Sequence, residues 1–120
     1  MRILLVDDEV ELVSAMAERL GYRDLDADWT DNGEDAIAMA AKTEYTVAVL
    51  DMKMPRMGGL ELREKLAFHH PDMRFIFLSG HGSESDFKAG CAAGCSYLIK
   101  PIQLEDLVDM IREVVGEDPA

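Results

Sequence analysis

Five polar residues in this sequence follow directly after short apolar segments. They are Asp7 and Asp8 after residues 3–6, Asp51 after residues 47–50, Ser79 after residues 75–78, and Lys100 after residues 97–99. If the apolar segments are parallel strands, their carboxyl ends share one edge of a sheet, and these side chains converge there. Three carboxylates, one hydroxyl and one ammonium group at one edge suit a divalent cation together with a phosphoryl group.

Asp51 carries most of this interpretation. A carboxylate at the end of an all-apolar strand is costly to bury unless its charge is compensated. Mg²⁺ fits best as the compensating ion, because it accepts one or a few carboxylates, retains waters and also binds phosphate oxygens. With such an ion Asp51 becomes a candidate nucleophile, since a carboxylate can form an acyl phosphate when the attacked phosphorus is held in line.

The other positions support this chemistry, although each has a structural alternative. Lys100 offers a compact positive charge to a phosphoryl oxygen, and the Ser79 hydroxyl can donate a hydrogen bond to it. The step from Lys100 to Pro101 predicts a tight turn, with a cis peptide bond as one option that would direct the lysine toward the site. Asp7, Asp8 and Glu9 by themselves fit solvated loop residues or a helix N-cap as well as they fit a functional site.

The elements that would position these residues alternate between short apolar segments and segments of helical periodicity. Five such alternations predict the α/β class, with a (βα)5 chain forming a doubly wound, five-stranded parallel sheet. Residues 25–29 alternate apolar and acidic side chains, which is typical of an edge strand. Residues 47–50 and 75–78 carry no charge, so we expect those strands to be buried on both faces.

The expected helices differ in how well their sequences support them. The inward faces of the first two consist of Val13, Met16, Ala17 and Leu20, and of Ala36, Ile37, Ala40 and Ala41. A third helix is expected over residues 60–68 and a fifth over residues 104–115. The fourth, over residues 84–93, contains Gly90, which lowers its helix propensity by about 1 kcal/mol. This helix is therefore the element expected to shift most readily.

Length and charge restrict the classes of protein to which this chain can belong. The 120 residues, 48% of them hydrophobic, fit one domain, expected over residues 1–116 with residues 117–120 as a tail or the start of a linker. The net charge of −12 disfavours direct binding of nucleic acid or of an anionic membrane. No apolar run approaches a membrane span, and residues 1–2 lead into a strand rather than an export signal, so a cytoplasmic location is expected.

Several other residues with chemical potential are interpreted as structural. Cys91 and Cys95 supply neither a four-ligand zinc set nor a disulfide framework, and we expect small, reduced core residues. Trp29 is expected to pack, and His81 to lie in an exposed loop, although contact of His81 with a phosphate or a partner stays open. A solvated helix end is expected at His69 and His70, and loop anchors at Met52, Met54 and Met57.

Five segments in a fixed order connect these observations. They are ILLVDDE at residues 3–9, NGEDA at 32–36, DMKMPRMGG at 51–59, LSG at 78–80 and AGCSYLIKP at 93–101. Together they resemble the receiver domain of two-component response regulators, and the resemblance extends from Ile3 to about Val115. It implies a flavodoxin-like fold with the strand order 2-1-3-4-5.

The resemblance also implies a role for each site residue. Asp51 would accept a phosphoryl group from the phosphohistidine of a histidine kinase. Asp7 and Asp8 would bind Mg²⁺ together with Asp51 and the backbone carbonyl of Lys53. Phosphorylation would then draw the Ser79 hydroxyl inward and change the burial of Tyr97, which alters the surface of the fourth helix, fifth strand and fifth helix. Ordinary sheet packing is the alternative interpretation of Tyr97.

The implied partners are a histidine kinase or phosphotransfer protein and a downstream effector domain or protein, with a homodimer as a further option. The sequence leaves the identity of the kinase and of the output open. Ser79 replaces the more frequent threonine but keeps the hydroxyl donor. Lys53 and His81 flank the approach of the attacking water, and the sign of their effect on the lifetime of the acyl phosphate is open.

A signalling switch would phosphorylate and dephosphorylate only itself and would not be an enzyme for an external substrate. Two other functions are alternatives to it. A haloacid-dehalogenase-type phosphatase also uses an aspartate, a lysine and Mg²⁺, but it needs a second acid two residues after the nucleophile. That position holds Lys53 here. The other alternative is an interaction module that uses the same fold without phosphorylation.

Overall fold

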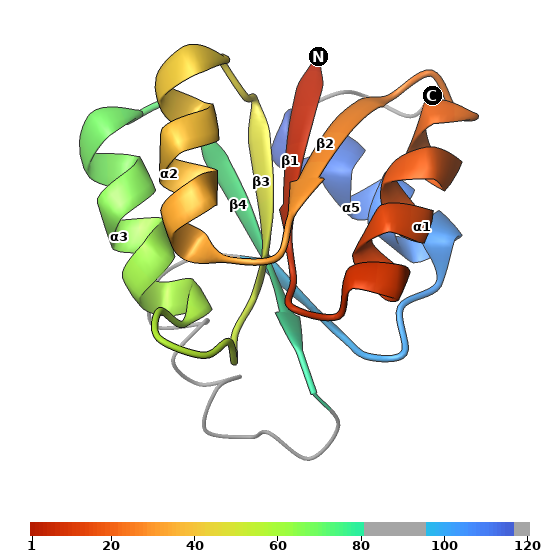
Figure 1. Cartoon of the computed structure of the whole chain (residues 1–120). Coiled ribbons are helices and arrows are strands. Elements are labelled where there is room, and N and C mark those ends of the chain that lie inside the picture. Colours follow the sequence, from red (N-terminus) through yellow and green to blue (C-terminus); the bar gives the residue numbers. More distant parts are fainter. Residues whose placement is uncertain (81–95, 117–120) are drawn as a thin grey trace.

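The computed structural model describes residues 1–80 and 96–116, which form a five-stranded parallel sheet with helices on both faces (Figure 1). The strands are β1 Arg2–Val6, β2 Asp26–Thr30, β3 Val47–Asp51, β4 Arg74–Ser79 and β5 Ser96–Ile99. The helices are α1 Val10–Gly21, α2 Gly33–Lys42, α3 Gly59–His69 and α5 Leu104–Val114. The order β2-β1-β3-β4-β5 confirms the predicted doubly wound α/β fold. The predicted fourth helix, residues 84–93, lies outside the described residues, as do His81, Cys91 and Cys95.

The apolar strands alternate their side chains between two buried cores. In β1, Ile3 and Leu5 face the core shared with α1 and α5, whereas Leu4 and Val6 face the core shared with α2 and α3. Residues 47–50 of β3 divide in the same way and are fully buried. Figure 1 shows the corresponding layers, with α1 and α5 on one side of the sheet and α2 and α3 on the other. The prediction that the central strands are buried on both faces is confirmed.

The outermost strand on the β1 side is β2, as its alternating sequence predicted. It pairs only with β1 among the described strands, with Leu5 opposite Trp29 and Val6 opposite Thr30. Trp29 is 38% exposed, and its expected packing role stays a prediction. The edge position explains why acidic side chains are tolerated in β2, because one side of the strand borders solvent.

The helices bury the faces predicted for them, with one exception. In α1, the residues Val13, Met16, Ala17 and Leu20 are buried. In α2, Ala36 and Ala40 are buried and Ile37 is partly buried, but Ala41 is exposed. The prediction for Ala41 was wrong because the buried stripe runs through Gly33, Ala36 and Ala40, and Ala41 is rotated about 100° from Ala40. Among the described residues, no helix is long and apolar enough to cross a membrane.

Candidate functional site

The candidate site forms where four neighbouring strands end. Asp7 follows β1, Asp51 and Ser79 are the last residues of β3 and β4, and Lys100 follows β5. Because these strands are parallel and adjacent, their carboxyl ends lie at one edge of the sheet, the lower edge in Figure 1. Asp7, Asp51 and Ser79 are buried, whereas Asp8 is exposed. The predicted convergence is therefore present in the structure.

Three carboxylates meet closely at this edge. One oxygen each from Asp7, Asp8 and Asp51 lie within 4.8 Å of one another. The Asp7 Oδ1 atom accepts a hydrogen bond of 3.0 Å from the backbone N–H of Glu9. The buried Asp7 Oδ2 atom lies 2.9 Å from the Lys100 ammonium and forms an ion pair with it. Three carboxylate oxygens at this spacing carry more negative charge than the Lys100 ammonium balances, and they fit a small hard cation such as Mg²⁺.

Burial and charge act together on Asp51. Burial raises the pKa of Asp51 to about 7, and the neighbouring Asp7 raises it as well. Lys100 and a backbone hydrogen bond from Lys53 lower the pKa and only partly offset that rise. A divalent cation among the three carboxylates would act in the direction of Lys100 and favour the ionised form.

Lys100 reaches back from the end of β5 into the acidic cluster. The peptide bond between Lys100 and Pro101 is cis, as the sequence allowed, and the Lys100 N–H donates to the Ser79 carbonyl at 2.8 Å. The Lys100 Nζ atom lies 2.9 Å from both Asp7 Oδ2 and Glu9 Oε1, and 3.6 Å from Asp51 Oδ2. Burial lowers the pKa of Lys100, but these acidic neighbours outweigh burial and leave the pKa above its usual value. Lys100 is thus a permanent positive charge beside Asp51.

Among the residues that the structure describes, the buried Ser79 hydroxyl beside this cluster makes one long hydrogen bond. Its Oγ atom donates to the Gly80 carbonyl at 3.5 Å, at the long end of the hydrogen-bond range. Such a donor loses little when it turns toward a new acceptor. Tyr97 lies in β5, half-buried, and packs against the core shared with α2 and α3.

The loop between β3 and α3 is fixed by two close backbone approaches. A β-carbon on Gly59 would lie 2.5 Å from the Asp51 carbonyl oxygen, and one on Gly33 would lie 2.7 Å from the Met57 sulfur. Met57 is buried, so its side chain anchors the loop against the start of α2. Met52 is also buried and Met54 is partly buried, consistent with the predicted anchoring role, while Lys53 is exposed. Space therefore requires a glycine at position 59, where the neighbouring atoms are backbone, whereas at position 33 the Met57 side chain would have to shift.

Sequence reasoning missed two contributions to this site. One is Glu9, whose carboxylate binds Lys100. Its signal was an acid directly after Asp8 and before a helix, for which a solvated loop residue or a helix N-cap was an equally good interpretation. The other is the pair Gly33 and Met57, whose contact joins segments that no local pattern connects.

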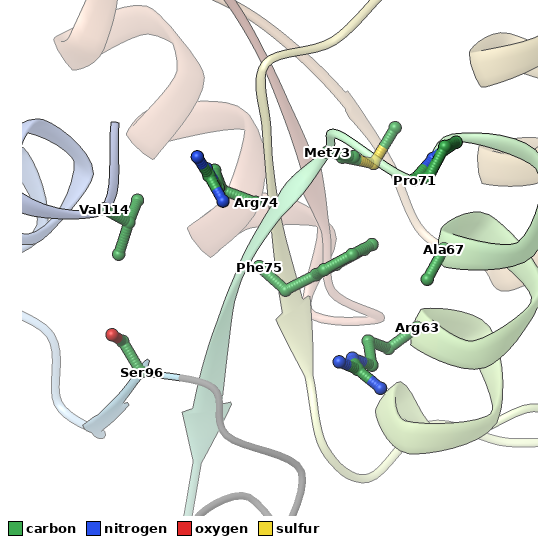
Figure 2. A pocket seen from close by; sticks show the side chains of 8 residues that line it. All are labelled: Arg63, Ala67, Pro71, Met73, Arg74, Phe75, Ser96 and Val114. Atoms are coloured by element: carbon green, nitrogen blue, oxygen red, sulfur yellow. The ribbon is translucent and has the colours of Figure 1, made fainter. Parts of the chain in front are cut away.

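A hollow of about 380 Å³ lies beside the start of β4, away from the carboxyl edge (Figure 2). Figure 2 shows Arg74 on the side of β4 that faces Val114 of α5, and Phe75 on the side that faces α3. The Arg63 guanidinium lies over the Phe75 ring, 5.7 Å from its centroid. The two guanidinium groups therefore lie on different sides of the strand and do not converge on one ligand.

The chain is similar to known signalling proteins over almost its whole length. Residues 3–112 match the family described as the response regulator receiver domain. Response regulator MprA of Mycobacterium leprae is 34% identical over 116 residues, which cover 96% of this chain and 51% of that protein. Response regulator RppA of Synechocystis is 33% identical over 122 residues, which cover 99% and 52%.

Solved structures show the same similarity. The crystal structure of a CheY-like response regulator receiver domain protein from Methanospirillum hungatei has a TM-score of 0.87 and 28% identity. The match covers 96% of this chain and 93% of that chain. By contrast, this chain spans only about half the length of the curated relatives MprA and RppA.

Proposed function

Because the chain belongs to the response regulator receiver domain family, we propose that Asp51 is the phosphoacceptor of a two-component signalling switch. The phosphoryl donor is the phosphohistidine of a histidine kinase or of a phosphotransfer protein. The observation that carries the proposal is the convergence of Asp7, Asp8 and Asp51 beside the Lys100 ammonium. Three carboxylates and one fixed cation suit a site that takes up both a divalent metal and a phosphoryl group.

In the proposed transfer, an Asp51 carboxylate oxygen forms a bond to phosphorus while the bond from phosphorus to the imidazole nitrogen breaks. The electron pair of the broken bond stays on the imidazole, which takes up a proton. Lys100 neutralises charge on the phosphoryl oxygens, and the Ser79 hydroxyl donates to one of them. Water later hydrolyses the acyl phosphate to inorganic phosphate and the Asp51 carboxylate. The chain thereby modifies and restores only itself, without turning over an external substrate.

Mg²⁺ is the cofactor that this donor set fits. The carboxylates of Asp7, Asp8 and Asp51 and the backbone carbonyl of Lys53 would hold the ion. When bound, Mg²⁺ neutralises charge on the phosphoryl oxygens. The negative charge of three clustered carboxylates beside the Lys100 ammonium supports this assignment, because a divalent ion would balance it.

The proposed signal leaves the site through Ser79 and Tyr97. When Ser79 turns toward the phosphoryl group, it leaves the Gly80 carbonyl, and the space near the half-buried Tyr97 changes. The surface of β5, α5 and the predicted fourth helix is then read by an effector domain or protein. We place this switch domain at residues 1–116, in the cytoplasm, with residues 117–120 as a tail or linker and homodimerisation as one form of output.

The phosphoacceptor role is tested by intact mass after incubation with acetyl phosphate and Mg²⁺. The wild type should gain one phosphoryl group, a chelator should prevent the gain, and Asp51→Asn should remain unmodified. Asp109→Asn, at an exposed position on α5, is the matched control and should gain the same mass as the wild type. A folded wild type that neither gains mass nor binds beryllofluoride would exclude Asp51 as phosphoacceptor and favour the interaction module.

A further inference from the structure

Glu9 connects the start of α1 to the lysine of the site. Its Oε1 atom accepts a hydrogen bond of 2.9 Å from Lys100 Nζ across 91 positions of sequence. Its backbone N–H donates to Asp7 Oδ1 at 3.0 Å. Glu9 therefore contacts both Asp7 and the Lys100 ammonium, although its carboxylate is not one of the three clustered carboxylates.

The Glu9 side chain does not perform the usual task of an acid at this position. Glu9 is the N-cap residue of α1, where acidic side chains commonly accept hydrogen bonds from the free N–H groups of the first turn. No such side-chain bond is present at Glu9. The carboxylate is directed toward Lys100 instead, so its orientation is explained by the lysine rather than by the helix.

Lys100 lies closer to Glu9 than to the proposed phosphoacceptor. The distances from Lys100 Nζ are 2.9 Å to Glu9 Oε1 and 3.6 Å to Asp51 Oδ2. A metal that occupies the lone pairs of Asp7 weakens the hold of Asp7 on the ammonium, which leaves Glu9 as the acceptor that competes for it. The Glu9 side chain is 61% exposed, so water can solvate its carboxylate when the lysine leaves.

We propose that Glu9 is a positioning residue that retains Lys100 in the unphosphorylated protein and competes with a phosphoryl group on Asp51 for the ammonium. The proposal rests on the proposed function of Asp51 and adds a regulator of that site. Glu9 sets part of the equilibrium between the two states, because movement of Lys100 toward a phosphoryl group on Asp51 stretches its 2.9 Å bond to Glu9. Removing the Glu9 charge should therefore favour the state with a phosphoryl group.

The test measures the dissociation constant of beryllofluoride in the presence of Mg²⁺ by calorimetry on the full chain. Glu9→Gln should bind the phosphoryl analogue roughly two- to fivefold more tightly than wild type, the range expected for an exposed ion pair. Glu11→Gln is the matched control, because Glu11 is an exposed acid in the first turn of the same helix. It should bind beryllofluoride as the wild type does.

A double-mutant cycle separates competition for Lys100 from general charge repulsion. In a Lys100→Gln background, Glu9→Gln should no longer improve binding, since the contested ammonium is gone. In the metal-free protein, the NMR signal of the Lys100 ammonium should shift in Glu9→Gln and stay in place in Glu11→Gln. Equal urea midpoints of the variants establish that the fold is retained.

The outcomes separate this inference from the proposed function. If wild type binds beryllofluoride but Glu9→Gln binds it equally or more weakly, competition by Glu9 is wrong while the phosphoacceptor site stands. If Glu9→Gln still tightens beryllofluoride binding in the Lys100→Gln background, competition by Glu9 for the ammonium is also wrong. If wild type fails to bind the analogue with Mg²⁺, the proposed function fails, and the role of Glu9 fails with it.

Discussion

The backbone of Gly59 packs so closely against Asp51 that a β-carbon at position 59 would lie 2.5 Å from the Asp51 carbonyl oxygen. Gly59 is the first residue of α3 and Asp51 is the last residue of β3. The Gly59 N–H also donates to the Met52 carbonyl at 3.1 Å. The start of α3 therefore fixes the backbone that carries the proposed phosphoacceptor.

A Gly59→Ala substitution should reduce stability by about 1–3 kcal/mol, because the added methyl group meets backbone that cannot move without displacing Asp51. Phosphorylation by acetyl phosphate should also slow. Gly21→Ala is the matched control, since a β-carbon there meets nothing within 4 Å. Urea unfolding compares the two variants, and equal midpoints would contradict the steric argument.

A Tyr45→Phe substitution should reduce stability by about 1–3 kcal/mol at neutral pH, because the Tyr45 hydroxyl donates a 2.7 Å hydrogen bond to Asp28 Oδ2. Burial and Asp28 raise the pKa of Tyr45 to about 12. The stabilisation from Tyr45 is therefore complete below pH 10 and is lost as the pH rises toward 12. Urea midpoints measured from pH 7 to 12 should fall less steeply in Tyr45→Phe than in wild type.

The control for the tyrosine prediction is Tyr22→Phe. The Tyr22 hydroxyl donates to Glu18 at 3.1 Å, but the side chain is 77% exposed. Its removal should leave the urea midpoint unchanged. An equal loss in both variants would show that the buried position of Tyr45 is not the cause.

If the carboxylate cluster holds Mg²⁺ as proposed, Mg²⁺ should raise the unfolding temperature of the wild type, because the unfolded chain lacks the assembled cluster. At a Mg²⁺ concentration 100 times its dissociation constant, the free energy of unfolding should increase by about 2.7 kcal/mol. Asp8→Asn should shrink this gain, since it removes one of three clustered carboxylates. Asp26→Asn, at the exposed start of β2, should retain the full gain in a thermal scan with and without chelator.

Ser79→Ala should still accept a phosphoryl group on Asp51, but the resulting structural change should reach Tyr97 only weakly. The reason is that the hydroxyl that would turn from the Gly80 carbonyl is absent. The measurement is the change in the NMR signals of Tyr97 on addition of beryllofluoride and Mg²⁺. That change should be large in wild type and small in Ser79→Ala. Ser79→Thr retains a hydroxyl and should respond as wild type does; a full response in Ser79→Ala would exclude the hydroxyl as the link.

The sequence by itself determined the class of the fold and the candidate chemistry of the site. A strand with no charged side chain, such as residues 47–50, is stable when both of its faces are buried. The carboxyl ends of parallel strands lie at one edge of the sheet. Asp7, Asp51, Ser79 and Lys100 could therefore be placed together before any distance was known. The acidic alternation of residues 25–29 likewise identified β2 as an edge strand.

Only the tertiary structure decided which atoms meet within that edge. The bond from Lys100 to Glu9, the contact of Gly33 with Met57 and the approach of Gly59 to Asp51 join segments on different elements. The pattern of apolar residues in one helix or strand shows which of its side chains face the core. It does not show which side chains of another helix or strand they contact. The exposure of Ala41 has the same cause, because the packing of α2 on the sheet, not its composition, sets the width of the buried face.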